Sequence, residues 1–469
     1  MMLDVAERYL DELAHRSLVK VELHEVDGES WLKYKKCVVH DLIHDLCLSK
    51  VKEERIISVI DFDRKRDEES RAIMVRRLCV RSYTGSENLL LKPYDQRASS
   101  HIRSLSVWNR RNHYIAWPGN ILSLEKHKLL RVLTARGYIF SDQNMRSISE
   151  LVYLKYLCLH HSVFYFLPSS IEKLRNLETL DARMSFGSLT IPNVLWKLKM
   201  LKHLYLPQDI RVRGKSKKLR LEGLNKLELI HNFNSEYCDA HDLLRLPNLK
   251  VIHGCIIVEE NITSENIAEF AKSRELRHTD IRVILGRQVS MVLLLECCFI
   301  DSLNIGGLEI PTPMHVFPKV YDYARSRLSQ LVLNGFKIEE DPMILLGKLP
   351  NLRHLALSTI EYLGGEIVCS AMSFLKLENL DLGGLKGLTG WRVEQGAIPK
   401  LSRLFIYECS ELEMLPEGLK HLTSLKSLHV IAMSTFTDKI KVIDGVEGQD
   451  FYKIRHIPDL RISAPRIWD

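Results

Sequence analysis

The segment CVVHDLIHDLC, from Cys37 to Cys47, contains two His-Asp pairs four residues apart. Such pairs can bind a metal ion, form a catalytic pair, contact a nucleotide phosphate or cap a helix. HDLIH repeats the i and i+4 histidine spacing of the zinc-protease motif HExxH, with Asp41 in the acidic position. However, His40 lies where the helix is expected to begin, and no third ligand accompanies the pair. We therefore expect no metal site.

A catalytic role for these residues has little support, because no nucleophile accompanies His40 and Asp41. No other set of acid, base and nucleophile stands out in the chain, so we expect no catalytic residues and no enzyme. In a purely structural role, the Asp41 side chain would cap the helix that follows by accepting hydrogen bonds from its first free N–H groups. His40 would then pack at the turn.

The elements around this segment predict part of a winged-helix module over residues 1–50. Apolar residues recur every three to five positions in LDVAERYLDELAHRSL, which predicts a helix. VKVELHE alternates polar and apolar residues and predicts a strand, and KYKKCVVH predicts a second strand around Val38. The Asp27-Gly28 pair between them is a strong hairpin signal. DLIHDLCLSK predicts the helix that follows the hairpin.

Composition favours an intracellular folded protein. The 469 residues are 46% hydrophobic and 27% charged, and no apolar run approaches the ~18 residues of a membrane span. The charged start of the chain does not resemble a signal peptide. Ten cysteines without a CxxC pair are expected to be reduced thiols. A net charge of +7 is mild for this length, so we expect no nucleic-acid partner.

A repeat of about 24 residues dominates the rest of the chain. The pattern LxxLxL occurs in LRNLETLDA, LKHLYL and LRHLAL, and thirteen such units follow one another at steps of 22 to 28 residues. This period is typical of leucine-rich repeats, whose units span about 20–29 residues. Two looser units, around Leu78 and Leu105, are expected to begin the array. The aligned central residues are Leu133, Leu157, Leu180, Leu204, Ile230, Ile252, Thr279, Leu303, Leu331, Leu355, Leu380, Leu404 and Leu428.

The repeat predicts an α/β solenoid, a leucine-rich-repeat horseshoe with a parallel concave sheet. One unit buries too few aliphatic side chains to offset the entropy of ordering some two dozen residues, so only stacked units form a continuous core. We expect about 13 to 15 repeats over residues 76–469, with a C-terminal cap at about 440–469. A charged linker, which includes DFDRKRDEESR, is expected over residues 51–75.

Strand positions between the apolar residues are expected to form the concave face, because successive side chains of a strand point to opposite faces. Aromatic, histidine and charged residues occupy many of these positions, and aromatic residues and Arg contribute most to protein interfaces. A plain hydrated surface is the alternative. The candidate protein-binding residues are Tyr156, His160, Asp181, Arg183, His203, Tyr205, His354, Asp381, Arg403, Phe405, Tyr407 and His429.

The chain resembles plant nucleotide-binding leucine-rich-repeat immune receptors of the coiled-coil class. VVHDLIHDLC followed by the repeat array is similar to the junction in that family, where the winged helix at the end of the nucleotide-binding (NB-ARC) region carries a motif of Met or Val, then His and Asp. Val39, His40 and Asp41 match it. AERYLDELAHRSLVKV, RRLCV, HIRSL, KLLRVL, LPSSIEKLRNLETLD and FYKIRHIPDL are also similar to family segments, so the resemblance covers essentially the whole chain.

The resemblance implies a nucleotide contact for the opening segment. In the family, the histidine of the motif approaches a phosphate of bound ADP and keeps the receptor inactive. Carried over, His40 would contact the nucleotide and Asp41 would hold the turn. ADP or ATP is thus implied for the full-length family.

The phosphate-binding part of the family pattern is missing. The loop G-x4-GK[ST] would wrap the phosphates with backbone amides. The chain's only GK[ST] is Gly214-Lys215-Ser216, and Asp209 stands where the first Gly belongs. The chain is therefore expected to represent the back half of a receptor. Alone, it should bind ADP or ATP weakly or not at all.

The resemblance implies a recognition and regulatory module of a cytoplasmic immune receptor, which could also lie at the plasma membrane or in the nucleus. Its repeats would bind a pathogen effector or a host protein that the effector modifies. They would also restrain a nucleotide-binding domain supplied in cis or in trans. A ubiquitin-ligase substrate receptor is the alternative, although the hairpin and the Val-His-Asp turn fit it poorly. An extracellular receptor lacks support, because no signal peptide or paired cysteines are present.

Overall fold

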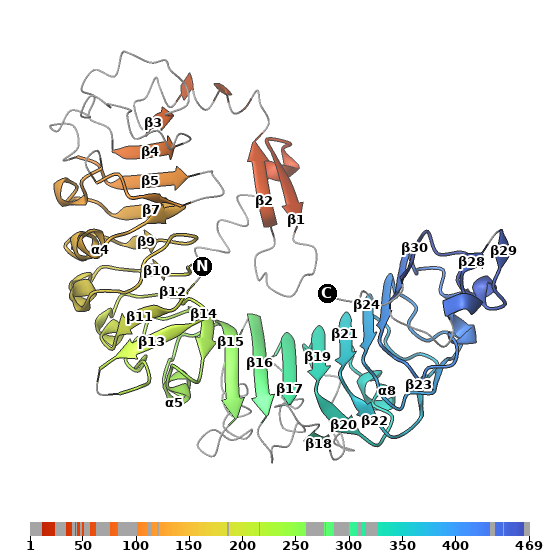
Figure 1. The fold of residues 1–469 in the computed structure, drawn as a ribbon. Helices are drawn as coiled ribbons and strands as arrows, with labels where there is room; N and C mark the ends of the chain where they lie inside the picture. The colour runs from red at the N-terminus through yellow and green to blue at the C-terminus, as the bar shows by residue number, and fades with distance from the viewer. Residues whose placement is uncertain are drawn as a thin grey trace. The chain divides into compact units, whose positions relative to one another are not determined.

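The computed structural model of the 469-residue chain describes residues 12–23, 34–39, 43, 45–46, 49–50, 57–61, 76–82, 101–109, 114–119, 122–184, 187–214, 216–258, 276, 278–285, 300–307, 312–314, 326–431, 437–443 and 445–463. These residues form two compact units, Met1–Leu249 and Lys250–Asp469. Each unit is built on a parallel sheet, as the repeat predicted (Figure 1).

An antiparallel hairpin precedes the parallel sheet of unit 1. Strand β1 (Val19–Leu23) pairs with β2 (Tyr34–Val39), and Val21 lies opposite Cys37. Residues 12–15 are helical and directly precede β1. The two predicted strands pair as expected, and the described part of the predicted helix, residues 12–15, is helical. His40 and Asp41 lie outside the described residues.

The sheet of unit 1 stacks one strand per repeat in parallel register. Its central apolar residues are buried and lie opposite one another in strand after strand, as the sequence series predicted. The strands, in order across the sheet, are β3 (Ile57–Asp61), β4 (Arg77–Ser82), β5 (Ser104–Asn109), β7 (Val132–Arg136), β9 (Tyr156–Cys158), β10 (Thr179–Asp181), β12 (His203–Tyr205) and β14 (Leu229–Asn234).

Strand β3 corrects the expected charged linker. The sequence predicts a linker over residues 51–75, yet residues 57–61 pair in parallel with β4, and Val59 lies opposite Cys79. The alternating apolar residues of ISVID are sufficient for a strand once a neighbouring strand offers its edge. The sheet therefore begins before residue 76. Residues 62–75, which hold most of the charged run, lie outside the described residues.

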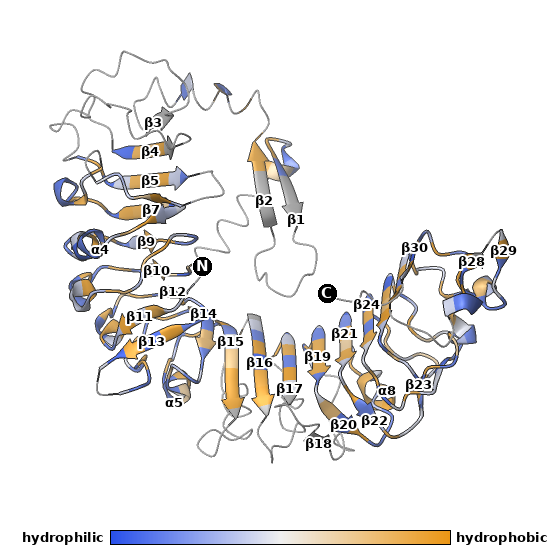
Figure 2. Ribbon diagram, viewed as in Figure 1, coloured by the Kyte–Doolittle hydropathy of each residue, from blue (hydrophilic) through white to orange (hydrophobic). Residues whose placement is uncertain are grey.

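Unit 2 continues the same architecture. Its strands, in order across the sheet, are β15 (Val251–Val258), β16 (His278–Leu285), β17 (Ser302–Gly307), β19 (Gln330–Asn334), β21 (His354–Ser358), β24 (Asn379–Gly383), β26 (Arg403–Tyr407), β27 (Ser427–Ile431) and β30 (Asp459–Ser463). Polar and apolar residues follow one another along these strands (Figure 2). The apolar set faces the core, and the other set forms the exposed face of the sheet.

The register of unit 2 differs from the sequence series at one repeat. Thr279 lies opposite Ile252, as aligned, but Leu303 lies opposite Ile281 and not Thr279. The alignment therefore moves by two residues between β16 and β17. A two-residue shift keeps the same face of the strand toward the core, and both Thr279 and Ile281 are buried.

On the side of each unit opposite the parallel sheet, short helices and strands connect one repeat to the next; those named here belong to the described residues. The helical elements are η1 (Leu124–Lys126), α4 (Asp142–Ser149), η2 (Ser169–Lys173), η3 (Leu195–Lys197), α5 (Ala240–Leu244), α8 (Met343–Leu346), η5 (Glu417–His421), η6 (Thr437–Lys439) and η7 (Phe451–Lys453). The outer strands are β6 (Ile115–Ala116), β8 (Tyr138–Ile139), β11 (Leu189–Pro192), β13 (Ile210–Arg213), β18 (Thr312–Met314), β20 (Phe336–Ile338), β22 (Glu361–Tyr362), β23 (Glu366–Cys369), β25 (Gly390–Val393), β28 (Val442–Ile443) and β29 (Val446–Glu447).

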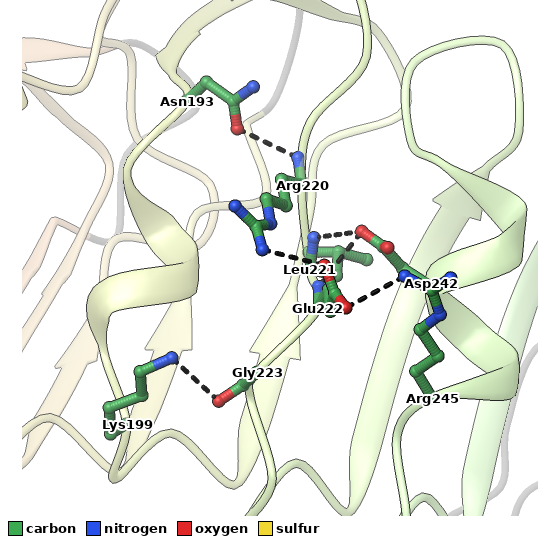
Figure 3. Close-up of polar contacts among 8 residues, drawn as sticks. All are labelled: Asn193, Lys199, Arg220, Leu221, Glu222, Gly223, Asp242 and Arg245. Carbon is green, nitrogen blue, oxygen red and sulfur yellow. Dashed lines mark hydrogen bonds and ion pairs between the residues drawn. The ribbon is translucent and has the colours of Figure 1, made fainter.

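Polar contacts between neighbouring repeats hold these outer segments in place (Figure 3). One carboxylate oxygen of Asp242 accepts hydrogen bonds from the backbone N–H groups of Leu221 and Glu222, at 2.6 and 3.0 Å. The Glu222 carboxylate in turn pairs with Arg220 at 2.7 Å and Arg245 at 2.9 Å. A buried acceptor that satisfies two backbone donors removes a desolvation cost that would otherwise oppose stacking.

A left-handed residue follows the strand in several repeats. Gly137, His161, Thr359, Gly384 and Glu408 have φ between 52° and 81°. The N–H of Thr359 donates to the Gly383 carbonyl in the next repeat at 2.9 Å, and the N–H of Gly384 does the same to Tyr407 at 2.9 Å. The inter-repeat hydrogen bond therefore imposes this backbone conformation even on residues that carry a Cβ.

No helix within the described ranges is both long enough and apolar enough to span a bilayer.

Candidate functional site

The candidate site is the face of each sheet formed by the strand residues that alternate with the buried apolar rows, which we call the open face. In unit 1, parallel register places Tyr156, Thr179 and His203 in one row. Asp181 and Tyr205 lie opposite each other in the next row, which begins with Cys158. The structure therefore brings the predicted residues of repeats around β9, β10 and β12 together.

An Asp-Arg pair forms the centre of the open face of unit 1. Arg183 donates from Nε to Asp181 Oδ1 at 3.0 Å and from Nη2 to Oδ2 at 2.7 Å. Its backbone N–H donates to the same carboxylate at 3.2 Å. Asp181 is only 4% exposed, and the Arg183 guanidinium lies 4.7 Å from the centre of the Tyr205 ring. A two-pronged, charge-assisted pair stacked on an aromatic ring is held in one geometry.

Histidines beside this pair are kept neutral. Burial, together with the nearby Arg183 guanidinium, lowers the pKa of His160 to about 4. The ring of His161 stacks on His160 with centroids 4.0 Å apart, and burial followed by the charge of Arg136 lowers its pKa. Burial also lowers the pKa of His203, whose Nδ1 lies 3.0 Å from Thr179 Oγ1. These imidazoles act as neutral polar groups at physiological pH.

The other titratable groups of the cluster are held in their protonated forms. Burial, reinforced by the Asp181 carboxylate, raises the pKa of the Cys158 thiol to about 11. Burial raises the pKa of the Tyr156 and Tyr205 phenols as well. A protonated thiol is a poor nucleophile, so this cluster is suited to binding and not to covalent chemistry.

The open face of unit 2 also gathers predicted residues, but with looser pairing. His354 Nε2 lies 3.4 Å from Asp381 Oδ2 on the neighbouring strand. His429 Nε2 lies 3.3 Å from Asp459 Oδ2, and Arg461 Nε donates to Asp459 Oδ1 at 3.0 Å. The hydrogen bonds from Arg461, His429 and Ser427 lower the pKa of Asp459.

Aromatic rings lie beside these pairs. The Phe405 ring centre is 5.0 Å from that of Tyr407 and 6.1 Å from that of His429, whose ring is nearly perpendicular to Phe405. Tyr407 packs over Gly383, where an added Cβ would lie only 1.9 Å from the Tyr407 Cζ. Burial raises the pKa of the Tyr407 phenol. Arg403 is exposed at the edge of this group.

Several residues of the open face were missed by the sequence analysis. Trp108 and Arg136 lie opposite each other on β5 and β7. Asp280 pairs with His253 at 3.3 Å, and Asp459 completes the pair with His429. Alternation from the aligned leucines Leu105 and Leu133 predicts the first two positions, so that signal was present.

The prediction of no metal site stays a prediction. Within the part of the chain that the structure describes, no three His, Cys, Asp or Glu side chains gather where they could hold a metal ion. Six cysteines of the described residues form no disulfide: Cys79, Cys158, Cys238, Cys255, Cys369 and Cys409. The nucleotide contact assigned to His40 and Asp41 also stays a prediction, because both residues lie outside it.

Two family models match parts of this chain. A family model described as a leucine-rich repeat region matches residues 101–446, and a model of the disease resistance protein winged-helix domain matches residues 1–47. A leucine-rich-repeat protein of Leptospira interrogans has a TM-score of 0.46 and 18% identity, over 83% of this chain and 89% of that one.

Two relatives come from Arabidopsis thaliana. Probable disease resistance RPP8-like protein 2 is 32% identical over 469 residues, which cover 98% of this chain and 49% of that protein. Disease resistance RPP8-like protein 3 is 30% identical over 468 residues, with the same coverage. The chain thus spans about half the length of these relatives. It belongs to the plant disease resistance proteins that carry a winged-helix domain and a leucine-rich-repeat region.

Proposed function

We propose that this chain is the recognition and regulatory part of a plant immune receptor. Its open face would bind a pathogen effector or a host protein that the effector has modified. The names of its relatives support a role in disease resistance. The observation that carries the proposal is the Arg183 guanidinium, which Asp181 holds at 2.7 Å and which stacks on Tyr205.

Preorganisation is the physical reason that this arrangement suits protein recognition. Association costs the entropy of every side chain that is immobilised, and groups already held in one geometry avoid that cost. Arg and Tyr are also enriched among the residues that contribute most to binding. The Phe405, Tyr407 and His429 group supplies a second set of half-buried rings in unit 2.

The regulatory part of the proposal rests on the winged-helix match over residues 1–47. A nucleotide-binding domain, in cis or in trans, would bring ADP or ATP against His40, with Asp41 holding the turn. We assign residues 1–50 to this module and the parallel strands from β3 (Ile57–Asp61) onward to the repeats. A binding partner that prefers one state of such a switch shifts its equilibrium only by its difference in affinity for the two states. The proposed location is the cytoplasm.

Affinity capture with matched variants tests the recognition function. The purified chain, its Arg183→Ala and Phe405→Ala variants and an Arg175→Ala control would be incubated with extract from infected leaves. Arg175 is an exposed residue on the turn before β10, away from the open face. We expect a protein whose recovery falls about tenfold or more with Arg183→Ala or Phe405→Ala and is unchanged with Arg175→Ala.

The captured protein would then be purified and its affinity for each variant measured directly. If no captured protein distinguishes the open-face variants from the control, recognition by the open face is wrong. Calorimetry with ADP tests the nucleotide part separately. We expect no micromolar binding to this chain alone, and such binding would contradict the need for a separate nucleotide-binding domain.

A further inference from the structure

A row of side chains on the open face of unit 1 lies beyond the residues discussed so far. Trp108 and Arg136 are directly opposite each other on β5 and β7, which are neighbouring strands. His160 lies two residues beyond Cys158, which faces Thr134. The Gly137 N–H donates to the His161 carbonyl, which brings Arg136 and His160 close together, and the charge of Arg136 acts on the His160 imidazole. We call these three residues the Trp108–Arg136–His160 row.

Backbone and side-chain contacts fix the spacing of this row. The Asn109 side-chain amide donates to the Gly137 carbonyl at 2.9 Å, and the Gly137 N–H donates to the His161 carbonyl at 2.9 Å. Gly137 has φ of 81°, and an added Cβ would lie 2.9 Å from the Asn109 Cβ. The residues that directly follow Trp108, Arg136 and His160 are thus joined by hydrogen bonds. These bonds limit the distance between neighbouring members of the row.

Two side chains of the row, Trp108 and Arg136, have exposed groups that a binding partner could contact. Trp108 is 42% exposed, although large aromatic side chains usually bury most of their surface. Arg136 is exposed, and among the residues that the structure describes no carboxylate pairs with it. The nearby Asp181 is fully engaged by Arg183. An exposed guanidinium beside an exposed indole is the combination found at the centres of protein interfaces.

We propose that this row binds an acidic segment of a protein partner, with an Asp or Glu carboxylate on Arg136 and an adjacent apolar side chain on Trp108. This inference rests on the proposed protein recognition by the open face. A carboxylate matches the planar fork of a guanidinium and can accept two parallel hydrogen bonds from it. The apolar neighbour would cover the indole surface that is now in water.

The neighbours of the row favour a carboxylate over a nucleic-acid strand. Burial holds the pKa of His160 at about 4, so this imidazole adds no positive charge at neutral pH. A phosphate backbone needs a continuous track of cations. Here Trp108 and neutral His160 flank Arg136, and the Asp181 carboxylate lies in the adjoining row.

Peptide selection on the full chain tests the inference. A displayed library of random peptides would be selected on the immobilised 469-residue chain and counter-selected on its Arg136→Ala variant. We expect enriched peptides to carry Asp or Glu beside an aromatic or aliphatic residue. In fluorescence anisotropy, Arg136→Ala should weaken such a peptide by about tenfold or more, and Trp108→Ala by a similar factor.

Two further variants separate binding from folding. Arg136→Lys keeps the charge but loses the two-pronged geometry, so it should bind with intermediate affinity. Arg175→Ala should bind as well as the unmodified chain, and all variants should share its circular dichroism spectrum. Replacing the acidic residues of the peptide by Asn and Gln should abolish binding.

Two results would overturn the inference. One is peptide binding that does not depend on Arg136 or on the peptide's acidic residues. The other is displacement of the peptide by labelled oligothymidylate at lower concentration than by the free peptide, which would indicate a nucleic-acid site. If either occurred while the captured leaf protein still depended on Arg183 or Phe405, recognition by the open face would stand and only this row would be reassigned.

Discussion

The two units place an aspartate at the same position of the open face and surround it differently. Asp181 in unit 1 and Asp381 in unit 2 each follow the central leucine of their strand. The Asp181 side chain is 6% exposed and pairs with Arg183 through both oxygens. The Asp381 side chain is 28% exposed and meets one nitrogen of His354 at 3.4 Å.

The neighbours of each aspartate explain this difference in exposure and pairing. Arg183 stands two residues after Asp181, whereas Gly383 stands two residues after Asp381. The glycine leaves space that the Tyr407 ring fills, and Ala356 beside Asp381 leaves the carboxylate open to water. The same scaffold thus makes a rigid, internally neutralised site in unit 1 and a more hydrated one in unit 2. Substitutions at the open-face positions are enough to change the site, because the buried leucine rows provide the stability of the fold.

Replacement of Asp181 and of Asp381 by Asn should give the largest difference in unfolding free energy between the two units. Asp181→Asn leaves Arg183 half-buried without its counter-charge, which should cost about 2–4 kcal/mol of unfolding free energy. Asp381→Asn removes a weaker, more exposed contact and should cost less than about 1 kcal/mol. Urea denaturation followed by circular dichroism measures both. Equal losses would show that burial of the Asp181 pair contributes little.

Acid should weaken unit 1 through His160. Its pKa is lowered to about 4 in the folded chain, against an unfolded value of about 6.5. The unfolded state therefore binds more protons between these values, and stability is complete above pH ~6.5 and falls as the pH drops towards 4. After allowance for its partial exposure, the loss should be about 1–2 kcal/mol.

His160→Gln is the matched variant for this pH effect. It keeps a polar side chain that does not titrate, so the difference in unfolding free energy between pH 7 and pH 4 should shrink by the same amount. The pKa itself can be followed by NMR of the imidazole nitrogens. An imidazole that titrates near its ordinary value would contradict the burial argument.

The left-handed residues allow a smaller, paired comparison. Thr359 in unit 2 has φ of 52°, and Gly384 in the next repeat has φ of 58°. Thr359→Gly should stabilise the chain by about 1 kcal/mol, because it removes the Cβ clash, and Gly384→Thr should destabilise it by a similar amount. Thermal unfolding measures both. Shifts of the same sign in the two variants would refute this explanation.

The smallest effect is expected for a surface network in unit 1. Glu178 lies between Lys155 and Lys202, with both Nζ atoms 2.8 Å from its oxygens, and these hydrogen bonds lower its pKa to about 2. Its contribution is present above the unfolded pKa of ~4.3 and is lost as the pH falls towards 2. Glu178→Gln should therefore cost about 0.5 kcal/mol at pH 7 and nothing at pH 2. An equal loss of unfolding free energy at pH 7 and pH 2 would show that Glu178 contributes through packing and not through its charge.

Much of the fold was predictable from the sequence, because the regular spacing of apolar residues is what allows the repeats to stack. The central residues from Leu133 to Ile230 lie opposite one another as aligned. Ile281 was missed in favour of Thr279, because both positions face the core and sequence spacing does not separate a two-residue shift. Strand β3 was missed because an edge strand beside a charged run has a weak pattern.

The candidate site was less predictable. Alternation placed Tyr156, Asp181 and Tyr205 on the open face, but it did not reveal which of them would be buried. The pairing of Asp181 with Arg183 depends on side-chain rotamers that the neighbouring Tyr205 ring stabilises. The exposure of Trp108 likewise depends on what its neighbours leave uncovered.

The sequence alone determined that the chain stacks parallel strands and which of their residues face the core, since a solenoid is a sum of local repeats and each repeat carries its own pattern. Only the tertiary structure decided which open-face groups are neutral, paired or available. Those properties depend on burial and on atoms brought close from neighbouring repeats, about two dozen residues apart in the chain.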